Sequence, residues 1–183
     1  MERFTQGFYG YAVAMLVCLA GVGVFLLVTP QSRTEHLPKV DFSIDVANMR
    51  RDAPYEVWSP EPAPAGWVPT SSRMTKEKGA VTWKLGFATA KRPEAATRSH
   101  AMLVQSDEKP AAEFANRMAN TSEVTGSIQI NGVTWEQRLR KDKDQRSLVR
   151  LLPDVTVVVT GTAPWEELSA LAGSLKQQVK AAS

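Results

Sequence analysis

Cysteine and histidine are scarce in this chain, and their scarcity excludes several kinds of chemistry. The one cysteine, Cys18, lies in an apolar run near the amino terminus, so the polar remainder has neither a disulfide nor a thiol. The only histidines are His36 and His100. Structural zinc sites take four ligands from cysteine and histidine. We therefore expect no metal site and no thiol redox chemistry in the polar remainder.

Clusters of basic residues and phosphate-binding motifs are also missing. The net charge of +3 is spread along the chain, whereas nucleic-acid-binding domains gather lysine and arginine on one face. Thr160-Gly161-Thr162 joins a strand to a helix but lacks the glycine spacing and the lysine of a phosphate loop. These absences predict neither a nucleic-acid partner nor a cofactor.

Residues Phe8–Val28 form an uninterrupted run without a charged side chain. About 20 such residues cross the hydrocarbon core of a bilayer as a helix. The run predicts one transmembrane helix over residues 8–28, after a short tail of residues 1–7. A cleaved signal peptide is the alternative, but its apolar stretch is about 7–15 residues long and ends at a small-x-small site. The only such site, Ala12-Val13-Ala14, lies inside the run.

The charges beside the apolar run give little guidance on orientation. Arg3 precedes the run, whereas Arg33 and Lys39 follow it. Positive residues favour the cytoplasmic side, so the count slightly favours a cytoplasmic carboxy-terminal part. Large domains cross membranes largely regardless of charge. The difference is only one or two residues, and it leaves the orientation open.

Proline separates the apolar run from the regular part of the chain. Six prolines fall between residues 30 and 64, and Ser59–Gly66 favours an extended, polyproline-like chain. We expect residues 29–65 to be a proline-rich tether, with residues 40–46 forming a short strand or an amphipathic connector. The folded domain is expected over residues 66–180.

Strand and helix patterns follow one another after Gly66. Val81, Trp83, Leu85 and Phe87 alternate with smaller or polar residues, which is the period of a half-buried strand. Asn131-Gly132 is typical of a two-residue hairpin turn. Strands are expected at 67–74, 81–87, 101–105, 128–130, 133–139, 148–152 and 155–160, and helices from residue 106 or 107 to 119 and from Pro164 to about Val179.

The order of these elements indicates the fold class. Short hairpin connections predict a mainly antiparallel sheet, and each helix has one apolar face that must pack on it. We expect an α+β domain of about seven strands and two helices.

Five tryptophans are candidates for a contact surface: Trp58, Trp67, Trp83, Trp135 and Trp165. Trp83, Trp135 and Trp165 fall in phase with the apolar faces of their strands or helix, so we expect them in the core. Trp58 and Trp67 flank the proline-rich stretch, and they are our candidates for an exposed contact surface.

His100 is the residue to consider for catalysis, beside Ser99 and Arg98. A Ser-His-Asp arrangement depends on proximity in space, and the chain has no G-x-S-x-G motif around a serine nucleophile. We assign no catalytic residue.

Several segments together resemble an actinobacterial membrane family known as domain of unknown function 4245. They are the amino-terminal apolar run, Val40-Asp41, residues 67–73, residues 83–87, residues 131–135 and residues 157–163. The resemblance implies a cytoplasmic amino terminus and a domain outside the membrane, against the charge count. It implies no activity and no catalytic residues. The domain outline also resembles small α/β sandwich modules of the photosystem PsbP type, a likeness of fold alone.

Three functions remain open. The first is a cell-membrane protein with one span, whose extracytoplasmic domain is a non-enzymatic module that binds an envelope protein or lipid. The second is an envelope enzyme acting on a lipid or cell-wall substrate, with a site that includes His100 and Arg98. The third is a structural subunit of a membrane complex.

Overall fold

The computed structural model describes residues 3–28, 37–95 and 97–178 and divides the chain into two units, Met1–His36 and Leu37–Ser183. The described residues of the first unit form helix α1 (Arg3–Val28). Within the described residues, no helix reaches both the length and the apolar character needed to cross a membrane. The transmembrane helix predicted over residues 8–28 is therefore not supported by the structure.

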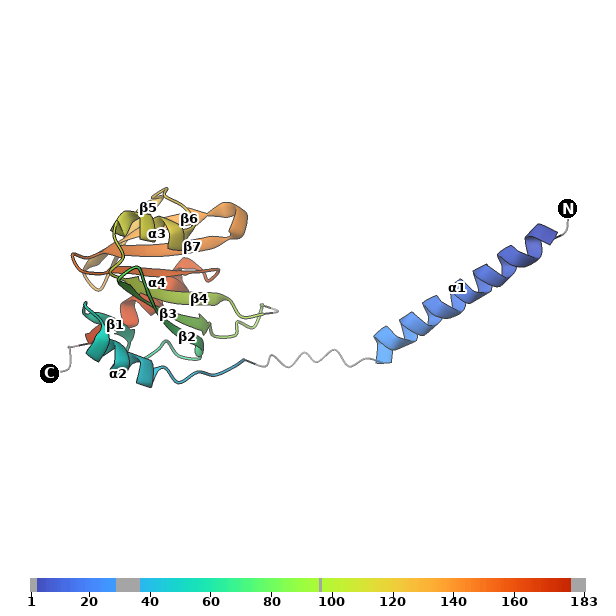
Figure 1. The fold of residues 1–183 in the computed structure, drawn as a ribbon, viewed down its shortest axis with the longest axis horizontal. Helices are drawn as coiled ribbons and strands as arrows, with labels where there is room; N and C mark the ends of the chain where they lie inside the picture. The colour runs from blue at the N-terminus through green and yellow to red at the C-terminus, as the bar shows by residue number, and fades with distance from the viewer. Residues whose placement is uncertain (1–2, 29–36, 96, 179–183) are drawn as a thin grey trace. The chain divides into compact units, whose positions relative to one another are not determined.

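A seven-stranded antiparallel sheet forms the centre of the second unit (Figure 1). Its strands follow the order β2-β3-β4-β8-β7-β6-β5. Strand β8 (Thr156–Gly161) lies in the middle and is buried along its whole length, as expected for a continuous β-branched run covered on both faces. The other strands are β2 (Val68–Glu77), β3 (Ala80–Ala88), β4 (His100–Ser106), β5 (Gly126–Ile130), β6 (Val133–Arg140) and β7 (Gln145–Leu151).

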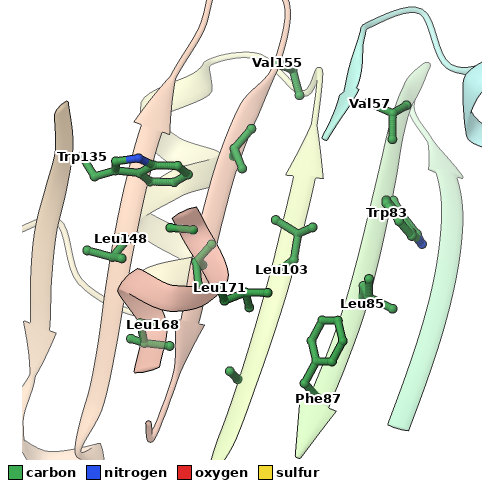
Figure 2. Close-up of a cluster of buried hydrophobic side chains, with 14 of the residues drawn as sticks. Val57, Trp83, Leu85, Phe87, Leu103, Trp135, Leu148, Val155, Leu168 and Leu171 are labelled. Carbon is green, nitrogen blue, oxygen red and sulfur yellow. The ribbon is translucent and has the colours of Figure 1, made fainter. Parts of the chain in front are cut away.

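Helices cover both faces of this sheet. Helix α3 (Ala111–Ala119) packs against β6, β7 and β8 on one face, where Phe114 meets Val104, Val149 and Val158. Helix α4 (Trp165–Ser174) covers the opposite face, which carries the larger core. Figure 2 shows Leu168 and Leu171 of α4 beside Leu148 and Leu103 of the sheet. The predicted α+β class with a mainly antiparallel sheet is confirmed.

The expected tether is wrong for residues 37–65, which belong to the folded unit. Helix α2 (Ser43–Asp52) replaces the expected strand or connector, and its Met49 is completely buried. Tyr55 and Val57 follow it into the core. The prolines therefore lie at the ends of short packed segments here, and the chain between them is not an extended tether. Residues 29–36 of the expected tether lie outside the described residues.

The carboxy-terminal helix is shorter than its periodicity predicts. Helix α4 ends at Ser174, and β9 (Leu175–Gln178) pairs antiparallel with β1 (Val57–Pro60). Leu175 still packs against the core, as its place in the predicted stripe suggested. Pairing with β1 gives the backbone partners that a longer helix would have supplied internally. The expected end of the helix at Val179 lies outside the described residues.

Two local predictions have different outcomes. The hairpin turn at Asn131-Gly132 is confirmed, because both residues have positive φ angles, 51° and 78°, as a type I′ turn requires. Helix α3 begins at Ala111, later than the expected start near Ser106, because Pro110 occupies the position before its first turn. A small helical turn at Lys141–Lys143 (η1) lies in the expected loop between β6 and β7.

Candidate functional site

Trp58, one of the two tryptophans predicted at a contact surface, lies on β1. Its backbone is hydrogen-bonded to a side chain of the large sheet. The completely buried Gln105 of β4 accepts a hydrogen bond from the Trp58 amide at 2.9 Å and donates one to the Trp58 carbonyl at 2.7 Å. Both ends of one side-chain amide therefore fix this residue. The indole is half-buried against the larger core, so the ring has a defined position without being enclosed.

Arg150 of β7 lies against the Trp58 ring. The guanidinium carbon is 4.9 Å from the ring centroid, which is the geometry of a cation–π contact. Partial burial lowers the pKa of Arg150. Among the described residues, no carboxylate forms an ion pair with this guanidinium. Arg150 thus keeps its hydrogen-bond donors available at a partly desolvated position.

These two residues line a cavity of about 240 Å³ between β1, β9 and the turn that joins β7 to β8. Apolar walls come from Leu152, Pro153 and Val155. The polar groups on the wall carry both signs of charge and an amide. They are Glu56, Arg150, Asp154 and Gln177. An apolar lining with a few polar groups is the usual composition of a binding site.

Trp67 does not line this cavity. Its amide donates to the Pro64 carbonyl, and its ring packs edge-on against Phe87 with centroids 5.9 Å apart. It too is half-buried. The two tryptophans that the sequence grouped together therefore contribute to different places. Within the described part of the chain, Trp58 stands beside a cation without an ion pair, and Trp67 contacts Phe87. Trp83 and Trp135 are buried, as predicted, and Trp165 is partly buried against the same core.

His100, at the start of β4, is exposed. Its ring lies above Gly86 of the neighbouring strand, where partial desolvation lowers the pKa of the imidazole. Arg98 donates to the carbonyl oxygens of Gly66 and Thr89. Within the described part of the chain, no three or more side chains of histidine, cysteine, aspartate or glutamate form a group that could hold a metal ion.

The sequence analysis missed Gln105 and Arg150. Gln105 follows Ala101 and Leu103 in phase with the core face of β4. Arg150 of β7 lies in phase with Leu148 of the same strand. A polar residue at a strand position where the alternating pattern expects an apolar one could have identified both residues. The distance along the chain between β1 and β7 concealed that these residues meet.

Comparisons with known proteins give a family and a weak structural similarity. No curated protein matches the chain. The crystal structure of MucB in complex with MucA(peri) is similar at 12% sequence identity with a TM-score of 0.38. That likeness covers 66% of this chain and 36% of the MucB chain, so the present chain spans about a third of the matched protein.

The family match, by contrast, extends over nearly the whole chain, from α1 to the end of α4. It includes the segments on which the resemblance above was based. On this match over residues 3–175, the chain belongs to the family described as protein of unknown function (DUF4245).

Proposed function

We propose that this protein is a membrane-anchored, extracytoplasmic and non-enzymatic module that binds a partner protein through the Trp58–Arg150 cavity. The observation that carries the proposal is the Arg150 guanidinium, without an ion pair among the described residues, 4.9 Å from the ring centroid of a tryptophan whose backbone is held by Gln105. Tryptophan and arginine are the residues most enriched where binding energy concentrates in protein interfaces.

The chemistry of the cavity favours a peptide ligand. A guanidinium in a cation–π contact still has five N–H donors, and these groups match a carboxylate or a carbonyl oxygen. Glu56 and Asp154 on the same wall accept hydrogen bonds from amide or ammonium groups. A chain terminus or a loop of a partner protein offers both kinds of group, with an apolar side chain for Leu152 and Val155.

Rigidity supports binding in another way. A binding residue that is ordered before contact costs less conformational entropy when the partner arrives. Trp58 meets this condition because its amide and its carbonyl are both bonded to one buried glutamine. The cavity is therefore arranged for recognition without requiring a change of fold.

The anchor in this proposal rests on the sequence, in which residues 8–28 carry no charged side chain. About 20 such residues match the thickness of the hydrocarbon core of a bilayer. We propose that residues 8–28 lie in the cell membrane and that the domain lies outside the cytoplasm.

The cavity is tested by site-specific photo-cross-linking. The full chain carries a photoreactive phenylalanine at Gln177, on the cavity wall, and is irradiated in intact cells. We expect a discrete adduct that is lost in Trp58→Ala and in Arg150→Gln. Arg146→Gln is the matched control, because it removes the same charge from the other end of β7. Trp67→Ala is also expected to retain the adduct.

Adducts of equal yield in wild type, Trp58→Ala and Arg150→Gln would overturn the role of the cavity. Far-UV circular dichroism of each purified variant establishes that the domain is folded. The location is tested separately, with a reporter that is active on only one side of the membrane fused after Ser183. Activity outside supports the extracytoplasmic placement, and activity inside contradicts it.

A further inference from the structure

Two basic side chains face each other on the sheet without an acidic partner. Arg73 of β2 is directly opposite Lys84 of β3 in the strand register. Like charges at opposed positions of an antiparallel pair destabilise a sheet. Neither side chain forms an ion pair with any residue that the structure describes. Such an arrangement is unfavourable for folding alone and becomes favourable when an anion lies between the two charges.

The pair lies on the face of the sheet that carries α3. Lys84 is opposite Val104 of β4, and Val104 belongs to the small core beneath α3. Helix α3 packs against β6, β7 and β8 on this face (Figure 1), whereas Arg73 and Lys84 lie on β2 and β3. This position is on the opposite face from the core that holds Trp58. The site is therefore independent of the Trp58–Arg150 cavity.

The floor of the site is Gly86, and polar side chains already fill the space over it. A methyl group built on Gly86 would lie 2.5 Å from Ser71 Oγ and 3.6 Å from both His100 Nε2 and Thr70 Oγ1. Three polar side chains thus gather over a position that has no side chain of its own. The register of β2 shifts between Pro69 and Ser71, and such irregularities re-aim side chains next to functional sites.

The surrounding cavity has the composition of an anion site. Its volume is about 320 Å³, and its lining residues are Val40, Ser71, Ser72, Arg73, Lys84 and Met102. This lining contains two cations, the Ser71 hydroxyl and no carboxylate. The Ser72 hydroxyl accepts a hydrogen bond from the Trp83 indole at 3.0 Å, on the other face of the sheet. By comparison, Arg140 and Arg117, elsewhere on the domain, are each paired with a nearby acidic side chain.

We propose that Arg73, Lys84, Ser71 and His100 bind the phosphate group of an ester, carried by an anionic lipid headgroup or by a small soluble molecule. Arg73 donates two N–H groups to a phosphate, and Lys84 adds a compact positive charge. The Ser71 hydroxyl and the His100 imidazole offer further donors over Gly86. Because a lowered pKa keeps His100 neutral at pH 7, the imidazole acts there as a hydrogen-bond donor, and the two basic residues supply the charge.

The test measures binding to the full chain in dodecyl maltoside micelles at physiological salt, where nonspecific attraction is screened beyond about 8 Å. Calorimetric titration with glycerol 3-phosphate is expected to show saturable binding at one site. Arg73→Gln and Lys84→Gln should each weaken it by about tenfold, because each removes a charge-assisted contact. Lys76→Gln is the matched control. It removes the same charge from β2, but Lys76 faces the opposite side in register with Val81, and it should change the affinity less than about twofold.

Gly86→Ala is a second variant that leaves both charges in place. Its methyl group occupies the floor of the site and meets the Ser71 hydroxyl, which can rotate away, so we expect the domain to fold and binding to be lost. Thermal unfolding accompanies each titration. Arg73→Gln should be at least as stable as wild type, since it removes a like-charge pair, and this separates loss of binding from loss of fold.

A lipid arm distinguishes the two sources of phosphate. Mixed micelles that contain phosphatidylglycerol are compared with micelles that contain the same fraction of uncharged diacylglycerol. If phosphatidylglycerol competes with glycerol 3-phosphate and diacylglycerol does not, the site binds a lipid headgroup. If neither lipid competes, the site binds a soluble ester. Absence of binding in both arms, or equal weakening by Lys76→Gln and Lys84→Gln, would overturn the proposal.

Discussion

Gln105 of β4 fixes Trp58 of β1 through both ends of its side-chain amide, at 2.9 Å and 2.7 Å. The glutamine is completely buried, so no water competes for these bonds. A polar residue in the middle of an apolar face thereby joins the small β1–β9 sheet to the large sheet. The same bonds place the tryptophan beside Arg150.

The first prediction concerns this link. Gln105→Met keeps the size of the side chain but leaves the amide and the carbonyl of Trp58 without these partners. An unsatisfied buried polar group costs about 1–3 kcal/mol, and we expect a loss of that order in the free energy of unfolding. Guanidinium unfolding followed by circular dichroism measures it. Gln129→Met, at an exposed position on β5, is the control and should change stability by less than about 0.5 kcal/mol. Equal losses would contradict the role of Gln105.

A second prediction tests whether residues 37–65 belong to the domain. Met49 of α2 is 0% exposed, whereas Ile44 of the same helix is 68% exposed. Met49→Ala should therefore cost about 2–5 kcal/mol, and Ile44→Ala should cost little. Thermal unfolding of the two variants makes the comparison. A flexible tether would tolerate both changes equally, and that result would restore the boundary expected at residue 66.

Alkaline stability depends on Tyr55. Its hydroxyl donates to the carbonyl oxygens of Val81 at 3.0 Å and Gln105 at 3.3 Å, and burial, with a smaller contribution from Asp107, raises the pKa of the phenol. Above pH 10, where an unfolded tyrosine loses its proton, the folded chain retains it. The unfolded state then binds fewer protons, so stability falls as pH rises.

Tyr55→Phe should remove the part of the fall in folding stability above pH 10 that comes from this tyrosine. At neutral pH the variant should lose about 0.5–1.5 kcal/mol with its hydrogen bonds. Denaturant unfolding at pH 7 and at several values above pH 10 gives the slope of the free energy of unfolding against pH for wild type and variant. Parallel slopes in wild type and variant would show that Tyr55 does not contribute to the pH dependence.

Close approach of two strands makes Gly161 sensitive to substitution. A methyl group there would collide with the His100 carbonyl oxygen and lie 2.8 Å from Ala101 Cα. The backbone atoms of His100 and Ala101 cannot rotate away from the methyl group. We therefore expect Gly161→Ala to lower the free energy of unfolding by about 1–3 kcal/mol. At Gly126 the nearest atom is the side-chain oxygen of Gln137, at 3.2 Å, and Gly126→Ala should be tolerated. Thermal unfolding compares the two, and equal stability would contradict the close approach.

Strong local patterns made much of the sheet predictable. Alternation in residues 81–87 located β3, and Asn131-Gly132 located the turn between β5 and β6. Pro164 marked the start of α4. Each prediction depended only on neighbours in the chain, and burial on one face repeats there with a regular period.

The wrong predictions fall where distant contacts decide the local structure. Prolines on both sides of α2 suggested an extended chain, but Met49 gains enough apolar burial to hold a short helix. The apolar face of α4 predicted a longer helix, but residues 175–178 pair as a strand with β1 instead. Intrinsic propensity is a weak preference that such contacts override.

The sequence by itself determined the α+β class, the positions of most strands, the burial of Trp83 and Trp135, and the family. Only the tertiary structure decided which polar residues meet. Arg150 reaches Trp58, and Arg73 lies opposite Lys84, because strand register and sheet order bring together residues far apart in the chain. Periodicity reports the face on which a side chain lies, whereas its partner depends on the pairing of whole strands.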